Sequence, residues 1–501
     1  MENRVLVVGA GPVGLFLAGE LKLGGADVVV YDRLPAPTGE SRALGFTKRV
    51  AEIFDQRGLL ERLGTFRWGR QGHFGGVGID LDLLDDDHHG VLGLPQSATE
   101  QMLADWLGEL GVPVRRGCEA VGLQQSADGV EALFDTPAGR RRESAAYLVG
   151  CDGGHSTIRT LAGIETSGWE STRGMYMADV TGAEVGHRPT GQYVPEGNMV
   201  LSVGLGDGYS RILMHDRSLP PRPDSRTLTF TEIADTWHRL TGEDIHHGSA
   251  RWMAAFSNGA ALAATYRSGR VLLAGDAAHD TPPLAGWGLS TGLQDAANLG
   301  WKLAAVTAAA APDSLLDTYH SERHPVGRRL MRNTHAATTL YLSGADLDPL
   351  RTLMRELMAG KEAAGHFAGM VSGLGVRYDM EDDTEPDATR SAAHPLLGLR
   401  LAPGRELERP DGSRTRVADL LRPGRGVLID TGTPAAAAAA AWADRVDTVT
   451  GHWTDTADTA GTGLGPVLVR PDGHIAWAAP GTGLTDALGR WFGPARTPAS
   501  V

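Results

Sequence analysis

Residues 5–14 read Val-Leu-Val-Val-Gly-Ala-Gly-Pro-Val-Gly, and this stretch decides the fold of the N-terminal part of the chain. Its four leading apolar residues form a continuous run, which is typical of a strand buried on both faces of a parallel sheet. A helical pattern follows through Leu17 and Leu21, and a second strand-like run, 28–31, ends at Asp32. The sequence therefore predicts a strand–helix–strand unit at the start of the chain.

Three glycines in the turn after the first strand point to a nucleotide. Gly9 permits a tight turn, Gly11 lets backbone N–H groups approach a pyrophosphate, and Gly14 allows close packing of the helix on the strand. The N-terminus of the helix adds a favourable field for an anion. Asp32 stands at the end of the second strand, where a carboxylate can accept hydrogen bonds from ribose hydroxyls. These residues predict a dinucleotide site but do not distinguish NAD from FAD.

Two further motifs bear on the choice between NAD and FAD. Residues 152–159, Asp-Gly-Gly-His-Ser-Thr-Ile-Arg, fit the pattern D-G-x-x-S-x-x-R. Residues 269–279 combine a buried-strand pattern with Gly275-Asp276, and a Pro/Gly loop then leads to a long helix predicted from about Leu289 to Ala311. With the glycine turn, this ordered set resembles the class A flavoprotein monooxygenases of the p-hydroxybenzoate hydroxylase type, and in particular the bacterial aromatic polyketide hydroxylases.

The resemblance implies an α/β fold, with a Rossmann-like FAD-binding domain, an inserted mixed β-sheet substrate domain and a C-terminal thioredoxin-like domain. We expect the FAD domain in residues 1–165 and 266–390, with about 73–94 as a candidate to face the substrate domain. The substrate sheet is expected in 166–265 and the last domain in 395–501. Both cysteines, Cys118 and Cys151, precede that domain, so it cannot exchange thiols. We expect it to be structural or interfacial.

The resemblance also assigns cofactor contacts. FAD contacts would come from Gly9, Gly11, Val13 and Gly14 at the pyrophosphate, Asp32 at the adenosine ribose, Arg33 at the adenine end, Arg42 near the pyrophosphate and flavin, Gln96 at the ribityl or phosphate region, and Asp276 at a ribityl hydroxyl. Asp152 either serves FAD placement and the approach of NAD(P)H or braces Arg159 and its turn. After Pro283, the backbone N–H groups of Gly288, Leu289 and Ser290 would face the flavin edge that becomes negative on reduction.

The loop before that helix departs from the family pattern in two places. Trp287 stands where glutamine is usual, and Ser290 stands where asparagine is usual. A serine can still cap a helix and donate one hydrogen bond. The tryptophan could stack near the isoalloxazine or restrict movement of the flavin. These departures bear on the reaction variant more than on FAD binding.

The substrate pocket is expected to be lined by the 166–265 sheet. Candidates are Trp169, Met175, Tyr176, Tyr193, Met199, Trp252 and Phe256, of which Tyr176, Tyr193 and Trp252, with Trp287 from the loop, are our predicted substrate contacts. Because side chains alternate along a strand, half of any such set must face elsewhere. No catalytic side chain is assigned, since the cofactor carries the chemistry, and no metal site is expected. His279 is interpreted as a packed residue.

The function implied by the resemblance is an FAD- and NAD(P)H-dependent monooxygenase, with NADPH preferred. It would hydroxylate a multi-ring aromatic polyketide with O₂ through a flavin C4a-hydroperoxide, in antibiotic biosynthesis. One alternative is a Baeyer–Villiger or oxidative-rearrangement enzyme acting on a related polyketide. Another is a non-catalytic flavin-bound carrier.

Composition excludes other classes of function. The 501 residues include 47 Lys+Arg and 61 Asp+Glu, and the net charge of −14 argues against binding to nucleic acid or to an anionic membrane. The longest apolar tract, 303–311, is far shorter than the roughly 20 residues that span a bilayer. Two cysteines suit a reducing compartment, so we expect a cytoplasmic protein. A homo-oligomer remains open.

Overall fold

The computed structural model describes residues 3–64, 67–83, 90–222, 225–380, 394–432, 435–454, 464–481 and 483–496. Part of the predicted 73–94 segment and the domain boundary predicted near residue 390 lie outside these ranges. Within them, no helix is long and apolar enough to cross a membrane.

A six-stranded sheet forms the centre of the FAD domain. Its order is β20-β21-β12-β1-β2-β8, with β1 Arg4–Val8, β2 Asp27–Tyr31, β8 Val114–Arg115, β12 Tyr147–Gly150, β20 Arg267–Ser268 and β21 Val271–Leu273. Strand β1 pairs in parallel with β2 and β12, and β12 pairs in parallel with β21. The predicted strand–helix–strand unit is therefore present, and both of its apolar runs are buried.

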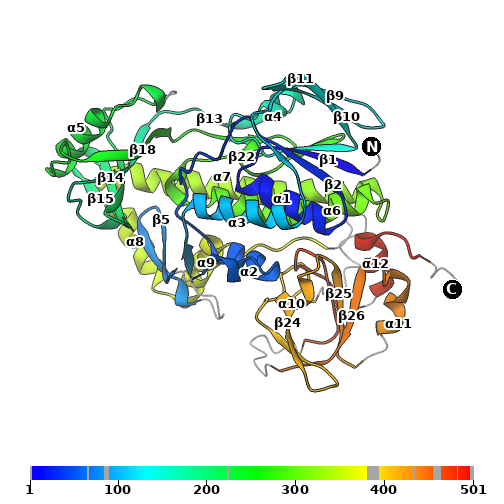
Figure 1. Cartoon of the computed structure of the whole chain (residues 1–501). Helices are drawn as coiled ribbons and strands as arrows, with labels where there is room; N and C mark the ends of the chain where they lie inside the picture. Colours follow the sequence, from blue (N-terminus) through cyan, green and yellow to red (C-terminus); the bar gives the residue numbers. More distant parts are fainter. Residues whose placement is uncertain are drawn as a thin grey trace.

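Helices cover one face of this sheet. Figure 1 shows α1 (Pro12–Leu23), α3 (Gln96–Glu109), α6 (Gly288–Thr307) and α7 (Asp317–Leu342) running together beneath β1 and β2 in that view. Strands β9 (Glu119–Gln125), β10 (Val130–Thr136) and β11 (Gly139–Ala145) lie above. Helix α6 ends at Thr307, earlier than predicted, because Ala309 adopts a positive φ of 50° that a helix cannot continue through.

An antiparallel sheet forms most of the segment 166–265, which is expected to bind the substrate. Its order is β15-β16-β17-β14-β18, with β14 Gly174–Thr181, β15 Arg188–Val194, β16 Asn198–Gly206, β17 Tyr209–His215 and β18 Ser249–Ser257. Helix α5 (Phe230–Thr241) packs on its outer face. The inner face is turned towards Leu284, in the loop before α6.

Shorter elements join the two domains. Strands β5 (Gln71–Phe74) and β6 (Val77–Asp80) form a hairpin covered by α8 (Asp348–Met358) and α9 (Lys361–Ser372). The remaining elements that bear on the site are α2 (Lys48–Gln56), α4 (Thr157–Leu161), β13 (Thr166–Trp169), β19 (Ala260–Ala263) and β22 (His279–Asp280).

The C-terminal domain has a mixed sheet of order β26-β25-β28-β29, with β25 Gly426–Asp430, β26 Val446–Thr450, β28 Val467–Val469 and β29 Ile475–Ala478. Its helices are α10 (Val417–Leu421), α11 (Ala435–Ala439) and α12 (Leu484–Phe492), and α11 lies in the alanine run 435–441. Strands β28 and β29 form an antiparallel hairpin. This domain lies below the FAD domain at the right of Figure 1.

Candidate functional site

The glycine turn encloses an open space. A Cβ at Gly9 would lie 2.2 Å from the Cys151 carbonyl oxygen, and one at Gly14 would lie 2.0 Å from the Gly9 carbonyl oxygen, whereas one at Gly11 would meet nothing within 4 Å. Helix α1 begins at Pro12 with no side-chain cap. The backbone is tightly packed around Gly9 and Gly14 but open beside Gly11, where the first N–H groups of α1 have no side-chain cap, and we call this turn the glycine cradle. This geometry fits a pyrophosphate.

Asp32 ties this turn to the end of β2. Its Oδ2 accepts a hydrogen bond from the Ala10 N–H at 2.6 Å, and its Oδ1 accepts one from the Leu34 N–H at 2.8 Å. The side chain is only half-buried, which leaves the carboxylate accessible to ribose hydroxyls. The neighbouring Arg33 is exposed at the surface.

Arg42 and Gln96, distant in sequence, are brought together. The Gln96 N–H donates to the Ala43 carbonyl at 3.0 Å, and the Ala43 N–H donates to Gln96 Oε1 at 3.4 Å. The Ser41 and Ser97 hydroxyls lie 2.9 Å apart. The segment carrying Arg42 is therefore docked on the N-terminus of α3. Burial raises the pKa of Asp276, and the charges of His279 and Arg42 offset part of that rise.

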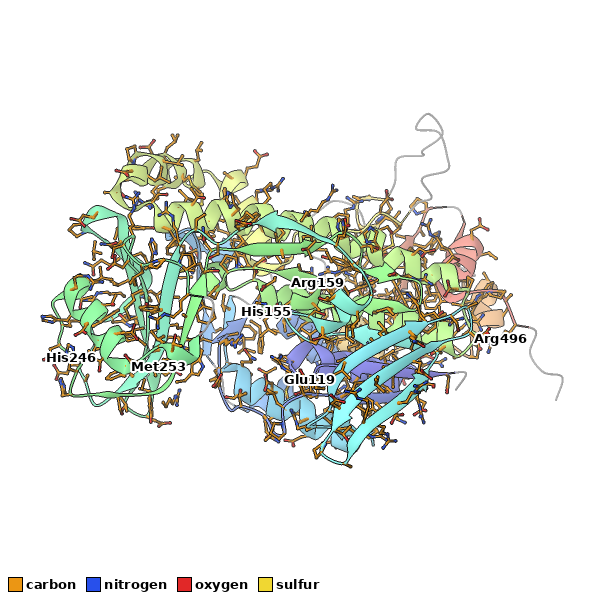
Figure 2. All side chains as sticks on the ribbon, turned by 90° about the horizontal axis from the view of Figure 1, so that it is seen from above. Glu119, His155, Arg159, His246, Met253 and Arg496 are labelled. Carbon is orange, nitrogen blue, oxygen red and sulfur yellow. The ribbon has the colours of Figure 1, made fainter. Side chains whose placement is uncertain are left out.

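Asp152 braces a turn. Its Oδ1 accepts the Ser156 hydroxyl at 2.5 Å and its Oδ2 accepts the Ile158 N–H at 3.0 Å, at the start of α4. Arg159 donates to the carbonyls of Gly154 at 2.7 Å and Ala277 at 2.9 Å, so it joins this motif to the one containing Asp276. In Figure 2, His155 and Arg159 lie near the middle of the molecule, between the end marked by His246 and the end marked by Arg496.

Asp276 lies in the short turn that follows β21. Its side chain has an exposed surface, yet its surroundings desolvate the carboxyl and raise its pKa. A Cβ at Gly288 would lie 3.8 Å from Asp276 Oδ1, and one at Gly292 would lie 2.8 Å from the Val13 side chain. The glycine turn, the 152–159 motif and Asp276 therefore converge on one region, where a ribityl chain could bind.

The loop 282–290 departs from expectation at both unusual residues. Ser290 is buried and its Oγ accepts the Thr47 N–H at 3.1 Å, so the hydroxyl fixes the start of α2 and does not cap α6. The Trp287 ring packs on Phe74 of β5, with ring centroids 5.9 Å apart and planes 28° apart, in a core that includes Leu330 and Ala337. Trp287 is 8% exposed. It is a core residue here, and we remove it from the proposed substrate contacts.

The predicted substrate residues divide by face. Trp252 packs on the inner face with Met175, Met177 and Leu284. Tyr176 stands between Met175 and Met177 in β14, and neighbouring side chains of a strand point to opposite faces. It therefore points to the outer face, where it packs in the cluster that includes Ile233 of α5. We therefore remove Tyr176 from the proposed pocket.

Tyr193 is held by its neighbours. Its hydroxyl donates to the Gly75 carbonyl at 2.9 Å, and the Arg351 guanidinium lies 3.8 Å from the ring centroid. Both groups connect β15 to the β5–β6 hairpin and α8. Tyr193 is paired with Met199 across β15 and β16, so it lies on the inner face, as Trp252 does, and its hydroxyl joins this face to the hairpin.

Sequence reasoning missed Arg211. Its guanidinium pairs with Asp179 at 2.7 and 3.0 Å, donates to the Arg42 carbonyl at 3.0 Å, and lies 5.0 Å from the Trp252 ring centroid. Arg211 is buried and therefore links the substrate sheet directly to the segment that carries Arg42. The only sequence signal was a charged residue within a largely apolar strand.

Asp280 is a second residue that the motifs did not single out. Burial, helped by the neighbouring Asp276, raises the pKa of its carboxyl to about 6. A Cβ at Gly154 would lie 2.3 Å from Asp280 Oδ2, so this carboxyl is pressed against the 152–159 motif. Among the described residues, no group of three or more His, Cys, Asp or Glu could hold a metal ion.

Comparison with known proteins decides the family. Residues 2–334 match the family described as FAD binding domain, and residues 394–495 match the one described as aromatic-ring hydroxylase, C-terminal. The chain belongs to this family of FAD-dependent monooxygenases. The cofactor expected at the cradle, FAD, is that of the family, and the convergent geometry fits it.

Full-length relatives support the assignment. The chain is 40% identical to a 12-dehydrotetracycline 5-monooxygenase/anhydrotetracycline 6-monooxygenase of Streptomyces rimosus, with 99% of each chain covered. It is 48% identical to CabE, an aromatic hydroxylase from angucycline biosynthesis, whose crystal structure matches with a TM-score of 0.93 over 99% of this chain and 100% of that one. It is also 36% identical to a dialkyldecalin synthase of Streptomyces rugosporus, over 99% of this chain and 100% of that one.

Proposed function

We propose that this monooxygenase hydroxylates a multi-ring aromatic polyketide in antibiotic biosynthesis, with NADPH as the preferred reductant. The observation that supports the substrate class is the apolar inner face of the substrate sheet, which packs towards Leu284 close to Asp276 and Gly288. The full-length relatives include hydroxylases of tetracycline and angucycline pathways. A flat, largely apolar ligand suits such a wall.

The residues of the cradle would hold FAD at both ends. The N–H groups of Val13 and Gly14 would bind the pyrophosphate, Asp32 the adenosine ribose and Asp276 a ribityl hydroxyl. Bound FAD, once reduced by NAD(P)H, supplies the activation of O₂. The first turn of α6 starts at Gly288, beside Asp276, and has no side-chain cap. Its N–H groups and helix field would stabilise negative charge on the reduced cofactor.

The inner face of the substrate sheet would orient the substrate and exclude water. Methionine side chains at 175, 177 and 199 adapt their shape to an aromatic surface, and thioether–aromatic contacts are favourable. Trp252 adds a rigid ring to the same wall. Exclusion of water matters because it suppresses unproductive loss of activated oxygen.

Turnover under air tests the proposal. The FAD-loaded enzyme is mixed with NADPH, or with NADH, and with aromatic polyketides, and products are analysed by mass spectrometry with ¹⁸O₂ and by NMR. We expect one ¹⁸O atom in a new hydroxyl group and faster turnover with NADPH. Reductant oxidation that substrate does not stimulate, with no labelled product from any polyketide, would contradict the substrate class.

Flavin retention tests the site itself. Asp276→Ala should purify with much less bound flavin, because a ribityl anchor is lost. Asp128→Ala, at an exposed turn between β9 and β10, is the matched control and should retain a full complement. Equal flavin content in the two variants would remove Asp276 from the site.

One relative favours a second candidate. One full-length relative is named a dialkyldecalin synthase, and this name does not describe an oxygenation. In that case the polyketide would rearrange with unchanged mass, and neither NADPH nor O₂ would be consumed. A Baeyer–Villiger reaction would instead place the labelled oxygen in a lactone ring, which NMR separates from a phenol.

A further inference from the structure

A hairpin of the C-terminal domain enters the FAD domain. Between β28 and β29, the Arg470 guanidinium donates to both carboxylate oxygens of Glu322 on α7, at 2.6 and 2.9 Å. The same guanidinium donates to Asp472, at 2.5 and 3.1 Å. Arg470 is 0% exposed and both carboxylates are buried. A charged group so placed is stable only while its partners remain.

Further buried contacts fix this hairpin. The Pro471 carbonyl accepts hydrogen bonds from Gln56, at 2.5 Å, and from Arg57, at 3.0 Å, both at the C-terminal end of α2. Arg57 also pairs with Glu20 of α1 at 2.5 and 2.8 Å. The hairpin is therefore bonded directly to α7 and to the end of α2, and through Arg57 to α1.

A second set of contacts reaches the loop that carries Asp276. The Asp295 carboxylate on α6 accepts the Gly275 N–H at 3.2 Å and lies 2.6 Å from His279 Nε2. Its other oxygen accepts Arg323 Nε at 2.7 Å. Asp295, His279 and Arg323 are all 0% exposed. The Asp295 carboxylate thus contacts the loop on both sides of Asp276.

Tyr378 connects the two sets. Its hydroxyl accepts Arg323 Nη1 at 3.0 Å, and its ring packs on the His474 ring of the hairpin, with centroids 4.1 Å apart. The Arg470 guanidinium lies 5.5 Å from the Tyr378 ring centroid. His474 is itself fixed, since its Nδ1 lies 3.0 Å from the Gly398 carbonyl. Buried contacts thus run from the hairpin through Tyr378, Arg323 and Asp295 to the loop.

We propose that the C-terminal domain is a positioning element for the flavin loop: its hairpin Arg470–His474 holds Tyr378 in place, and Tyr378 and Arg323 orient Asp295, which sets the loop Gly275–His279 and hence Asp276. This role rests on FAD binding and not on the identity of the substrate. It gives a domain without redox cysteines a direct influence on how the cofactor is held.

The test measures FAD affinity in variants that change single groups of this path. Tyr378→Phe removes only the hydroxyl, and His474→Ala removes the ring that packs on Tyr378. Titration of each apoprotein with FAD, followed by quenching of flavin fluorescence, should give a dissociation constant about three- to tenfold higher, the size of one ordinary net hydrogen bond. The visible absorption bands of the bound flavin should also shift.

The double variant tests the connection. If both residues act through one path, Tyr378→Phe/His474→Ala should weaken FAD binding no more than the stronger single change, since contacting residues on one path are not additive. Independent, fully additive effects would overturn the path through Tyr378.

A matched control separates positioning from general loss of stability. Trp442→Phe removes one buried hydrogen bond of the C-terminal domain, from the indole N–H to the Gly493 carbonyl at 2.8 Å. It should lower the thermal midpoint of the apoprotein and leave the FAD dissociation constant within about twofold. The proposal fails if Trp442→Phe weakens FAD as much as Tyr378→Phe, or if Tyr378→Phe changes neither affinity nor spectrum. Neither result would bear on whether the wild-type enzyme hydroxylates a polyketide, so the proposed function is tested separately.

Discussion

The glycine cradle differs in construction from the C-terminal junction, by which we mean the hairpin Arg470–His474 and its partners on α2 and α7. In Gly9–Gly14 the glycines have no side chains to cover the backbone N–H groups, which stay accessible because a cofactor must supply the remaining contacts. At Arg470–His474 the chain fills the space with charged side chains that satisfy one another. The comparison teaches that the first region is sensitive to added volume, whereas the second is sensitive to the loss of a single charge.

Volume at the cradle gives the largest expected effect. Gly14→Ala would place a methyl group 2.0 Å from the Gly9 carbonyl oxygen, so we expect loss of folded, FAD-binding protein. Gly11→Ala meets nothing within 4 Å, and its apoprotein should fold as the wild type does while binding FAD more weakly. Apoprotein circular dichroism and FAD titration compare the two. A Gly11→Ala variant that binds FAD normally would show that the cradle is not where the pyrophosphate lies.

Charge at the junction gives the next largest effect. Arg470→Leu leaves the buried Asp472 without its guanidinium partner and leaves Glu322 with only its ion pair to Lys302, and we expect the free energy of unfolding to fall by about 3–5 kcal/mol. The exposed pair of Arg62 and Glu109 is the control, and Arg62→Leu should leave the urea midpoint nearly unchanged. Equal midpoints for the two variants would contradict the contrast between regions.

The contribution of Asp280 to the stability of the fold is expected to depend on pH. Its folded pKa of about 6 exceeds the ordinary value of 3.8, so the folded protein retains a proton that the unfolded chain releases. Its contribution to stability is therefore full below about pH 4 and is lost as the pH rises to about 6.

Asp280→Asn removes this dependence. The variant should become more stable than the wild type across that window, by about 1–3 kcal/mol above pH 6. Thermal midpoints of both proteins between pH 4 and 8 measure the difference. A constant gap across this range would show that Asp280 does not titrate as described.

Ser290 gives the smallest effect. Ser290→Ala leaves the Thr47 N–H without its acceptor, at an expected cost of about 1 kcal/mol in the free energy of unfolding. Ser290→Thr keeps an acceptor oxygen and serves as the control. Urea unfolding of both variants checks the prediction, which is wrong if alanine and threonine behave alike.

The motifs predicted which segments of the FAD-binding domain lie close together, while the contacts of individual residues with FAD stay predictions. The glycine turn, Asp152 and Asp276 were identified because each needs a particular residue type at a fixed place after a strand, and the structure brings all three together. The same logic assigned the family. Local sequence is enough where backbone geometry and a motif decide the contacts.

Side-chain direction and long-range pairing were not predictable in this way. Tyr176 packs on the outer face of its sheet, and its residue type could not reveal this because composition does not give the register of a strand. Trp287 turned to Phe74, more than 200 residues earlier in the chain. The junction joins Arg470 to Glu322 and Arg400 to Glu52, partners that no local spacing connects.

The contact of Trp287 with Phe74 limits how this enzyme can be re-engineered. Grafting a relative's loop at 282–290 would remove the indole and leave a void beside β5, unless the strand is exchanged as well. The loop and the hairpin Gln71–Asp80 therefore constitute one transplantable module. Chimaeras that swap both segments together should retain their packing where single-segment exchanges lose it.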